Sequence, residues 1–326
     1  MKDIKHKLLA LVKDDLAAIE TALEENLKPH LDLVSQIARH ILFSGGKRLR
    51  PLLMVLSARL CGYTGNYDKT FSTIFEYLHA ATLLHDDLVD QATLRRGNPV
   101  AHSIWGNASA VLVGDFLLAR SLSIAAETEL PDVIRIVAEI TENMSQGEIH
   151  QLIRKGSLDL TEKEYMEVIR RKTAVLFQGT CRVSALISGA PKEQETALSN
   201  YGFNLGMAFQ MVDDLLDYTL DTDILGKEVG ADLKEGKLTL PVIYSLKAAN
   251  TTDRIKMEKI IKDKAFSVED FETLIALMKK YGGQKYTENL ARKYVKHAKD
   301  ALRVFNHSKT KEILLMIADY TLTRNL

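Results

Sequence analysis

The sequence predicts an all-α protein, on the basis of three observations. The chain has 326 residues with only 6 Pro and 18 Gly, so few positions interrupt a helix. Apolar residues recur at the i, i+3, i+4 spacing of a helix that is buried on one side, and no segment alternates convincingly like a half-buried strand. Because 46% of the residues are hydrophobic and no linker-like stretch is present, the chain fits one large helical domain over residues 1–326.

The prolines divide the chain into long helical segments. Each lies next to a break in the apolar periodicity, as expected of a helix start or an inter-helix turn; they are Pro29, Pro51, Pro99, Pro131, Pro191 and Pro241. Between them, the spacing predicts helices over residues 104–128, 131–153, 192–218 and 241–249. Two looser regions, residues 97–99 and 226–236, are predicted to be loops.

Composition excludes several classes of protein. Lys+Arg and Asp+Glu both number 43, so the basic surface of a nucleic-acid-binding protein is not expected. Cys61 and Cys181 are too few for a disulfide framework and suit a reducing compartment. The first apolar run, residues 8–12, is too short for a signal peptide, and no window reaches the ~18 apolar residues of a membrane span. We therefore expect a cytoplasmic protein without a transmembrane segment.

Two aspartate clusters share one internal spacing and lie in apolar, helix-like stretches. On a helix the first and last aspartates of each cluster share a face, where like charges cost about 0.2–0.5 kcal/mol per pair unless a cation lies between them. Mg²⁺ is such a cation, since it combines one or two carboxylates with waters and substrate phosphates. One cluster alone is as readily a solvated helix face, but two copies favour a metal site. The clusters are Asp86-Asp87-Leu-Val-Asp90 and Asp213-Asp214-Leu-Leu-Asp217.

Basic residues accompany the acidic clusters. The segment 44–51 combines Lys47 and Arg50 with two glycines at a helix start, where side chains and free backbone N–H groups can hold an anion, although it lacks the Walker spacing. Arg95 and Arg96 follow the first cluster. His79 lies two turns before Asp86, but a lone histidine on an apolar helix is more often a core residue. Further candidates, each on its own as readily a surface residue, are Lys172, Thr173, Lys227 and Lys237.

Taken in order, these motifs resemble the trans-polyprenyl diphosphate synthases, most of all their bacterial long-chain, octaprenyl type. The resemblance spans residues from about 30 to 245 and agrees in order, spacing and residue identity. Its motifs are Gly45-Gly46-Lys47-Arg48-Leu49-Arg50-Pro51, the stretch 76–90, Arg95-Arg96-Gly97, Lys172-Thr173, the stretch 206–217, and Gly226-Lys227 through Gly236-Lys237. It implies the isoprenoid synthase fold, a helix bundle around a deep central cavity with the two aspartate-rich helices facing each other across its mouth. It also implies a homodimer.

The resemblance also implies roles for individual residues. Asp86, Asp90 and Asp213 would hold Mg²⁺ ions on an allylic diphosphate, supported by Asp87, Asp214 and Asp217. That diphosphate, or the leaving group formed from it, would be contacted by Arg95, Lys172, Gln210, Lys227 and Lys237. Isopentenyl diphosphate would bind Lys47, Arg50, His79 and Arg96, and Thr173 would lie beside the reacting carbons. Metal ions and fixed cations would stabilise departing pyrophosphate, and the allylic cation would be attacked by isopentenyl diphosphate in a dry cavity.

Product length depends on the cavity wall below the metal site. In the resembled family, the fifth and fourth residues before the first aspartate lie in that wall, and here they are the small Ala81 and Thr82. We therefore expect a long product, heptaprenyl to decaprenyl with octaprenyl as the central estimate, for quinone side chains; a transient membrane contact would serve its release. The alternatives are a farnesyl or geranylgeranyl diphosphate synthase and a subunit of a heteromeric synthase without activity of its own. A terpene cyclase is disfavoured because the second cluster repeats the first.

Overall fold

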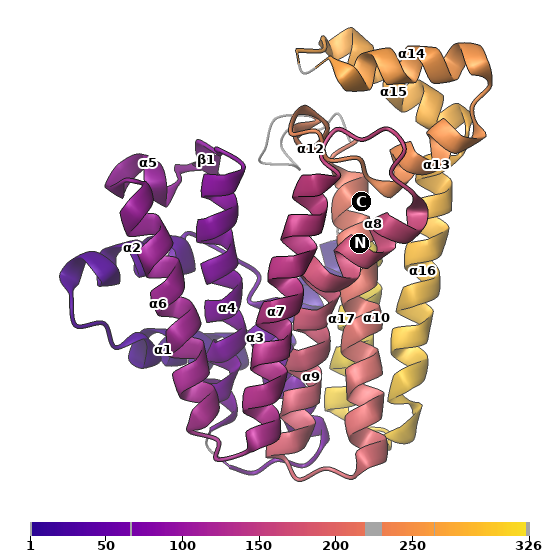
Figure 1. Cartoon of the computed structure of the whole chain (residues 1–326). Helices are drawn as coiled ribbons and strands as arrows, with labels where there is room; N and C mark the ends of the chain where they lie inside the picture. The colour runs from indigo at the N-terminus through magenta and orange to yellow at the C-terminus, as the bar shows by residue number, and fades with distance from the viewer. Residues whose placement is uncertain (1, 66, 219–229, 264, 324–326) are drawn as a thin grey trace.

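The computed structural model describes residues 2–65, 67–218, 230–263 and 265–323, and it is almost wholly helical, which confirms the predicted fold class (Figure 1). The first half of the chain contains α1 (Lys2–Leu27), α2 (Asp32–Phe43), α3 (Leu49–Leu60), α4 (Asp68–Val89), β1 (Leu94–Arg95), β2 (Asn98–Pro99), α5 (Ala101–Trp105), α6 (Asn107–Ala126) and α7 (Pro131–Ile153). The second half contains α8 (Glu162–Ile169), η1 (Arg170–Ala174), α9 (Val175–Ile187), α10 (Lys192–Leu216), α12 (Ala231–Lys234), α13 (Leu240–Ala248), α14 (Thr251–Lys262), α15 (Val268–Lys280), α16 (Gly283–Ala301), η2 (Leu302–Val304) and α17 (Lys309–Thr323).

The helix boundaries follow the local sequence closely, except that the short helix α12 lies within the loop predicted over residues 226–236 and that one predicted helix is divided. Helix α7 begins at Pro131, the first helical position, where a missing N–H costs nothing. Helix α10 follows Pro191 and ends at Leu216, two residues before the predicted end. The single helix predicted over residues 104–128 is wrong at its start, because Gly106 takes φ +82° and ψ 159° and divides the segment into α5 and α6. A glycine adopts this backbone conformation without the steric cost that a Cβ would impose.

The loop predicted near Gly97 contains the only strand pair in the described part of the chain. Leu94 pairs with Pro99 and Arg95 with Asn98 in an antiparallel register. The two central residues, Arg96 and Gly97, both have positive φ, at 54° and 79°. Two positive φ values are the requirement of the tight two-residue turn that suits the twist of paired strands. This hairpin follows α4 and holds Arg95 against Asp87 of the first aspartate cluster.

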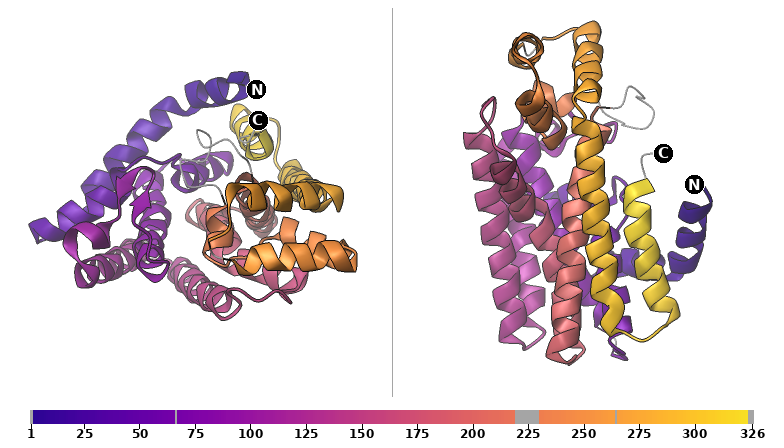
Figure 2. Two further views of the ribbon diagram at one scale, coloured as in Figure 1. Left: turned by 90° about the horizontal axis from the view of Figure 1, so that it is seen from above. Right: turned by 90° about the vertical axis from the view of Figure 1, so that its right-hand side faces the viewer.

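The long helices pack side by side, so that both aspartate clusters lie at one end of the bundle. Helix α4 packs along α6, and α10 packs along α9 on one side and α16 on another. In Figure 1, β1 marks the upper end of α4 and α12 marks the upper end of α10, so the carboxyl ends of both helices point upward. Figure 2 shows α14 and α15 at that same end of the molecule. One large core joins α1–α4 to α6, α7, α9 and α17, and a second lies around α12–α16.

Three glycines allow neighbouring helices to approach η1 and the start of α9 closely. A Cβ on Gly147 of α7 would lie 2.8 Å from Cβ of Arg171 and 2.9 Å from the backbone nitrogen of Lys172. On α10, a Cβ on Gly206 would lie 2.7 Å from Cα of Ala174, and one on Gly202 would lie 2.3 Å from the carbonyl oxygen of Phe177. Distances below 3.0 Å are not tolerated by real Cβ atoms. The glycines therefore set the spacing of α7, η1 and α10, which together carry much of the candidate site.

Candidate active site

Both aspartate clusters occupy the last turn of a helix. Asp90 is the C-cap residue of α4, and Asp217 is the C-cap residue of α10. A helix C-terminus carries partial negative charge, so carboxylates there are unfavourable unless cations are nearby. Helices α4 and α10 thus each carry three carboxylates at the carboxyl end, where negative charge is electrostatically unfavourable. Such an arrangement lowers stability and fits a site that binds cations.

Within the first cluster, each aspartate lies next to a basic side chain. Asp87 is only 3% exposed and accepts three hydrogen bonds of 2.6–2.9 Å from the guanidinium of Arg95. Asp90 lies 2.8 Å from Nζ of Lys237 and 3.4 Å from Nζ of Lys155. Burial works to raise the pKa of the Asp90 carboxyl, but the charge of Lys237 and its hydrogen bond outweigh this, so the pKa is lowered.

Asp86 shares its cation with a second acid. Nζ of Lys172 lies 3.5 Å from Oδ2 of Asp86 and in a closer ion pair with Glu148. Burial raises the pKa of the Asp86 carboxyl to about 6; the charge of Lys172 opposes this, and those of Glu148 and Asp90 add to it. A bound divalent cation would favour the ionised carboxylate in place of the shared lysine.

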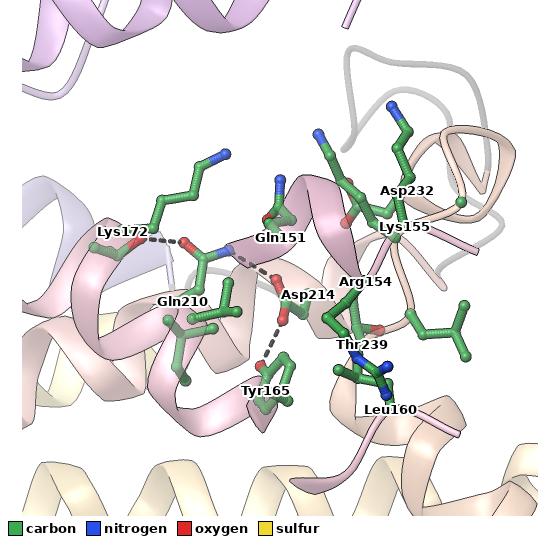
Figure 3. Close-up of a pocket in the computed structure, with 16 residues that line it drawn as sticks. Gln151, Arg154, Lys155, Leu160, Tyr165, Lys172, Gln210, Asp214, Asp232 and Thr239 are labelled. Atoms are coloured by element: carbon green, nitrogen blue, oxygen red, sulfur yellow. Dashed lines mark hydrogen bonds between the residues drawn. The ribbon is translucent and has the colours of Figure 1, made fainter. Parts of the chain in front are cut away.

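The second cluster is built around a buried carboxyl group. Asp214 accepts a hydrogen bond of 2.5 Å from the hydroxyl of Tyr165 and one of 2.7 Å from Nε2 of Gln210 (Figure 3). Its pKa is raised to about 8, first by burial and then by the charge of Asp232. Asp217 is buried as well and accepts from the backbone N–H of Asp232 at 3.2 Å. Asp213 is half-buried.

The structure therefore divides the six aspartates into two groups. Asp87, Asp214 and Asp217 are buried and bonded to protein groups, whereas Asp86, Asp90 and Asp213 are half-buried. Among the residues that the structure describes, no three acidic, histidine or cysteine side chains converge closely enough to hold a metal ion by themselves. A centre that completes its coordination with water and substrate phosphates needs fewer protein ligands, so the residues present fit Mg²⁺ bound together with a diphosphate.

Two of the predicted basic residues, Lys172 and Lys237, lie against the first aspartate cluster. Lys172 lies on η1, a π-helical turn between α8 and α9, and π turns of this kind often occur at functional sites. Lys237 is largely buried between Asp90 and Glu235; burial tends to lower its pKa, but the two carboxylates raise it overall. The prediction for Lys227 falls outside the described residues.

The other predicted basic residues form a separate cluster near α3. Arg50 lies over the ring of Phe177, 4.9 Å from its centroid, and Lys47 lies 5.8 Å from the ring centroid of Tyr320. A Cβ on Gly46 would lie 3.3 Å from the Arg96 guanidinium, which places the hairpin against this loop. His79 is half-buried, and burial together with Arg50 and Arg95 lowers its pKa well below the usual value. A neutral imidazole surrounded by arginines is a suitable donor for an anion.

Arg48 holds this basic loop in place from within the core. It has φ 47° in the left-handed region, and its side chain is 5% exposed. Its guanidinium donates to Glu20 on α1 at 2.6 and 3.1 Å, to Glu76 on α4 at 2.8 Å and to the carbonyl of Leu42 at 2.7 Å. Removing one partner of such a buried pair typically costs about 3–5 kcal/mol. Arg48 therefore ties the loop that carries Lys47 and Arg50 to α1, α2 and α4.

Two cavities lie beside these residues. One, of about 120 Å³, is lined by polar and apolar residues from α7, α8, η1, α10 and the segments 154–160 and 232–239; the polar ones include Lys155, Lys172, Thr173, Gln210, Asp214 and Lys237. The other, of about 60 Å³, lies between α4, α6 and α7 and is lined by Leu78, Ala81, Thr82, His85, Leu118, Thr141, Met144 and Ser145. Ala81 and Thr82 thus line a cavity on the α4 side, directly below Asp86 in the helix.

Several residues of this site were not assigned from the sequence. Tyr165, Glu148 and Lys155 contact predicted site residues but carry no recognised motif. For Glu148, the local signal is Gly147, whose missing Cβ lets α7 approach η1. Arg48 and Glu76 lie inside the motifs, but no sequence pattern indicated that they pair with each other.

The comparisons with known proteins agree with this geometry. The family model described as polyprenyl synthetase matches residues 31–278. The chain is 36% identical to the octaprenyl diphosphate synthase of Escherichia coli (strain K12) over 98% of both chains, and 33% identical to heptaprenyl diphosphate synthase component 2 of Bacillus subtilis (strain 168) over 98% of this chain and 91% of that one. A crystal structure of a polyprenyl synthase from Caulobacter crescentus CB15, complexed with calcium and isoprenyl diphosphate, is similar with a TM-score of 0.92 and 36% identity over 98% of each chain. Shorter-chain synthases also occur among the matches.

Proposed function

Since the chain belongs to the polyprenyl synthetase family and is a prenyltransferase that makes polyprenyl diphosphates, we propose that it extends an allylic diphosphate with isopentenyl diphosphate to a long all-trans product, with octaprenyl as the central length. The observation that carries this proposal is the position of the small Ala81 and Thr82 in a cavity directly below the first aspartate cluster. Nothing bulky from these two positions obstructs a growing chain.

The family depends on a divalent metal, and for this chain we propose Mg²⁺ as the ion. Asp86, Asp90 and Asp213 would hold it, because these are the three half-buried members of the clusters. When bound with substrate, the ions neutralise negative charge that develops on the leaving pyrophosphate. Asp87, Asp214 and Asp217 would keep the two helix ends in position through their bonds to Arg95, Tyr165 and the backbone of Asp232.

The basic residues would divide between the two substrates. Arg95, Lys172, Gln210 and Lys237, with Lys227, would act on the allylic diphosphate, because the four described residues lie against the aspartate clusters. Lys47, Arg50, His79 and Arg96 would bind isopentenyl diphosphate in the arginine-rich cluster near α3. Preorganised cations of this kind stabilise charge that develops in the transition state without further reorganisation.

We propose that the final proton passes to the departing pyrophosphate. The imidazole of His79 is a poor base here, since burial and the neighbouring arginines lower its pKa well below the usual value. Pyrophosphate leaves with negative charge at the side of the cavity where the carbons react, so it can accept the proton without movement of a protein group. The carboxylates would then act through the metal rather than as general bases.

We further propose a homodimer formed through α6 and α7. Helix α6 is long and apolar enough to cross a membrane by length and composition alone, as core helices of soluble proteins also can be, and one side of it packs against α4. Its outer side exposes Leu112 at 65%, and the neighbouring α7 exposes Ile149 at 56% and Ile153 at 71%. Large exposed apolar surfaces usually mark interfaces. Sedimentation of the protein at several concentrations tests this, and a Leu112→Asp variant should shift the equilibrium towards monomer.

Residues 1–326 are proposed to act as one domain in the cytoplasm, with a transient membrane contact for product release. The packing of α1 against both α3 and α17 supports the first part, because it joins the two ends of the chain. The nearly neutral composition and the two reduced cysteines support the cytoplasm. No nucleic-acid partner is proposed.

A direct assay tests the proposed function. The purified protein is incubated with Mg²⁺, isopentenyl diphosphate and an allylic diphosphate, and the dephosphorylated products are sized by chromatography. Octaprenyl or similar lengths are expected. Products of farnesyl or geranylgeranyl length would mean that residues deeper in the cavity limit growth. No turnover without a second protein would favour a subunit of a heteromeric synthase, a candidate that the similarity to component 2 of Bacillus subtilis supports.

A further inference from the structure

Tyr165 is a buried tyrosine whose hydroxyl is directed at the second aspartate cluster. It lies on α8, is 4% exposed, and donates to Oδ2 of Asp214 at 2.5 Å. It lines the larger cavity but belongs to none of the sequence motifs. Because a buried hydroxyl normally has a partner, the hydrogen bond alone carries no functional meaning. What distinguishes Tyr165 is the chain of hydrogen bonds that continues beyond Asp214.

The chain runs from Tyr165 through Asp214 and Gln210 to Thr173. The side-chain amide nitrogen of Gln210 donates to Oδ1 of Asp214 at 2.7 Å, and the hydroxyl of Thr173 donates to the amide oxygen of Gln210 at 2.8 Å. Figure 3 shows Tyr165 and Gln210 on opposite oxygens of Asp214, with Lys172 beside the same cavity. In this arrangement the amide nitrogen of Gln210 faces Asp214, and the amide oxygen therefore faces Thr173 and accepts its proton.

The π-helical turn brings both ends of the chain to one side of the helix. Thr173 follows Tyr165 by eight residues, which in a regular helix would place them about 80° apart. A π turn contains one extra residue, so the pair is equivalent to a spacing of seven and lies within about 20°. Gln210 and Asp214 are four residues apart on α10 and share a face in the same way. The turn η1 therefore permits a closed network between two helices.

We propose that Tyr165 is a positioning residue that sets the orientation of the Thr173 hydroxyl through Asp214 and Gln210. The proposal rests on the proposed function, which places Thr173 beside the reacting carbons. Because the Thr173 hydroxyl donates its hydrogen to Gln210, a lone pair of its oxygen faces the cavity. A lone pair there stabilises a developing allylic cation. Tyr165 itself touches no substrate.

Removal of the tyrosine hydroxyl would release this orientation. Without the tyrosine hydroxyl, Oδ2 of Asp214 loses its hydrogen bond, and the carboxyl group is free to rotate away from Gln210. The Gln210 amide can then turn over and offer its nitrogen to Thr173. The Thr173 hydroxyl would point its proton at the reacting carbons, which disfavours a cation. Substrate binding would change little, because the diphosphate contacts of Lys172 and Lys237 stay in place.

A double-mutant cycle between Tyr165→Phe and Thr173→Val tests the proposal. We expect Tyr165→Phe to lower kcat about tenfold, with each KM within about twofold of the wild-type value. In the Thr173→Val protein, the same change should lower kcat less than about twofold, because its target is gone. A second cycle with Gln210→Met should show the same loss of effect, since it breaks the chain at another point. Wild-type turnover and the loss caused by Thr173→Val alone test the proposed function separately from this coupling.

Two buried tyrosines provide matched controls. Tyr201 donates to the carbonyl of Leu314 at 2.8 Å, and Tyr77 donates to that of Leu23 at 2.6 Å, both away from the two cavities. Tyr201→Phe and Tyr77→Phe should lower thermal stability as much as Tyr165→Phe but leave kcat unchanged. If Tyr165→Phe lowers kcat equally in the wild-type protein and in the Thr173→Val variant, the proposal is overturned. An unchanged kcat in Tyr165→Phe would also overturn the proposal. A loss of kcat that is restored by raising the Mg²⁺ concentration would overturn it too, because Tyr165 would then act on metal binding.

Discussion

Ala81→Phe is the change that tests the control of product length most directly. Ala81 is buried and lines the smaller cavity together with Leu78, Met144 and Leu118. It lies five residues before Asp86 on α4, which is about 7–8 Å along the helix axis. A ring at this position would meet the tail after one or two additions, while the groups around the metal site would be untouched.

The magnitude follows from the size of the cavity. Its volume is about 60 Å³, and Ala81→Phe would place a whole phenyl ring in it. Overpacking of this kind typically costs about 1–3 kcal/mol, and a chain of this length would then melt a few degrees lower, by roughly 2–4 °C per kcal/mol or less. A long tail must itself displace lining side chains, and the flexible Met144 can move more easily than a packed ring.

The assay is chromatographic sizing of the dephosphorylated products, combined with single-turnover measurement of the first condensation. We expect products of farnesyl or geranylgeranyl length, with the first condensation at a near-normal rate. Ala81→Ser is the matched control, and it should keep the wild-type product because serine adds one small atom. A folded Ala81→Phe protein that still makes the wild-type length would refute the reasoning, because growth would then not pass this wall.

Three further predictions concern the charged residues. Asp86→Asn and Asp213→Asn should each lower activity at least about 100-fold, and chelation should abolish turnover until Mg²⁺ is returned; full activity in excess chelator would contradict the metal assignment. Arg50→Ala should raise the KM for isopentenyl diphosphate about tenfold or more, and Arg95→Ala that for the allylic substrate; Arg95→Ala should also destabilise the fold by about 3–5 kcal/mol, because Asp87 keeps a buried charge. The pKa of Asp86 is raised to about 6, chiefly by burial. The folded protein therefore holds this proton where the unfolded chain, with a pKa near 3.9, has lost it. The contribution of Asp86 to stability accordingly falls as the pH rises from about 4 to 6, while Mg²⁺ binding in the presence of pyrophosphate strengthens across pH 6. Calorimetric titration at several pH values would show this, and Asp86→Asn should lack that part of the pH dependence.

Helices with clear sequence boundaries could be predicted almost to the residue. The segments 131–153 and 192–218 begin at or after a proline and keep one apolar face throughout, and α7 and α10 agree with both at their starts. The segment 104–128 also has helical periodicity, which gives no warning that Gly106 interrupts it. The decisive property is the backbone angle of a single glycine, and it depends on how α5 packs on α2, α4 and α6.

The site was predictable where residues of one chemistry lie close together in the sequence. The aspartates and the paired arginines belong to short motifs, and both aspartate clusters lie at the carboxyl ends of their helices, at the same end of the bundle. Tyr165, Glu148 and Lys155 could not be found in this way, because their partners are 49, 24 and 65 residues away. Each is an ordinary helix or loop residue until the fold places it next to a motif. The left-handed conformation of Arg48 is likewise invisible in the sequence.

The pairing of Arg48 with Glu20 has a consequence for where this protein can be cut or joined to another. The family match begins at residue 31, so a shortened chain designed on that boundary would lack α1 entirely. Arg48 would then lose two of its four hydrogen bonds, and the core side of α3 and α4 would meet water. We expect such a fragment to aggregate or to bind isopentenyl diphosphate poorly, although every recognised motif is present. Fusion partners are better attached before α1 than in place of it.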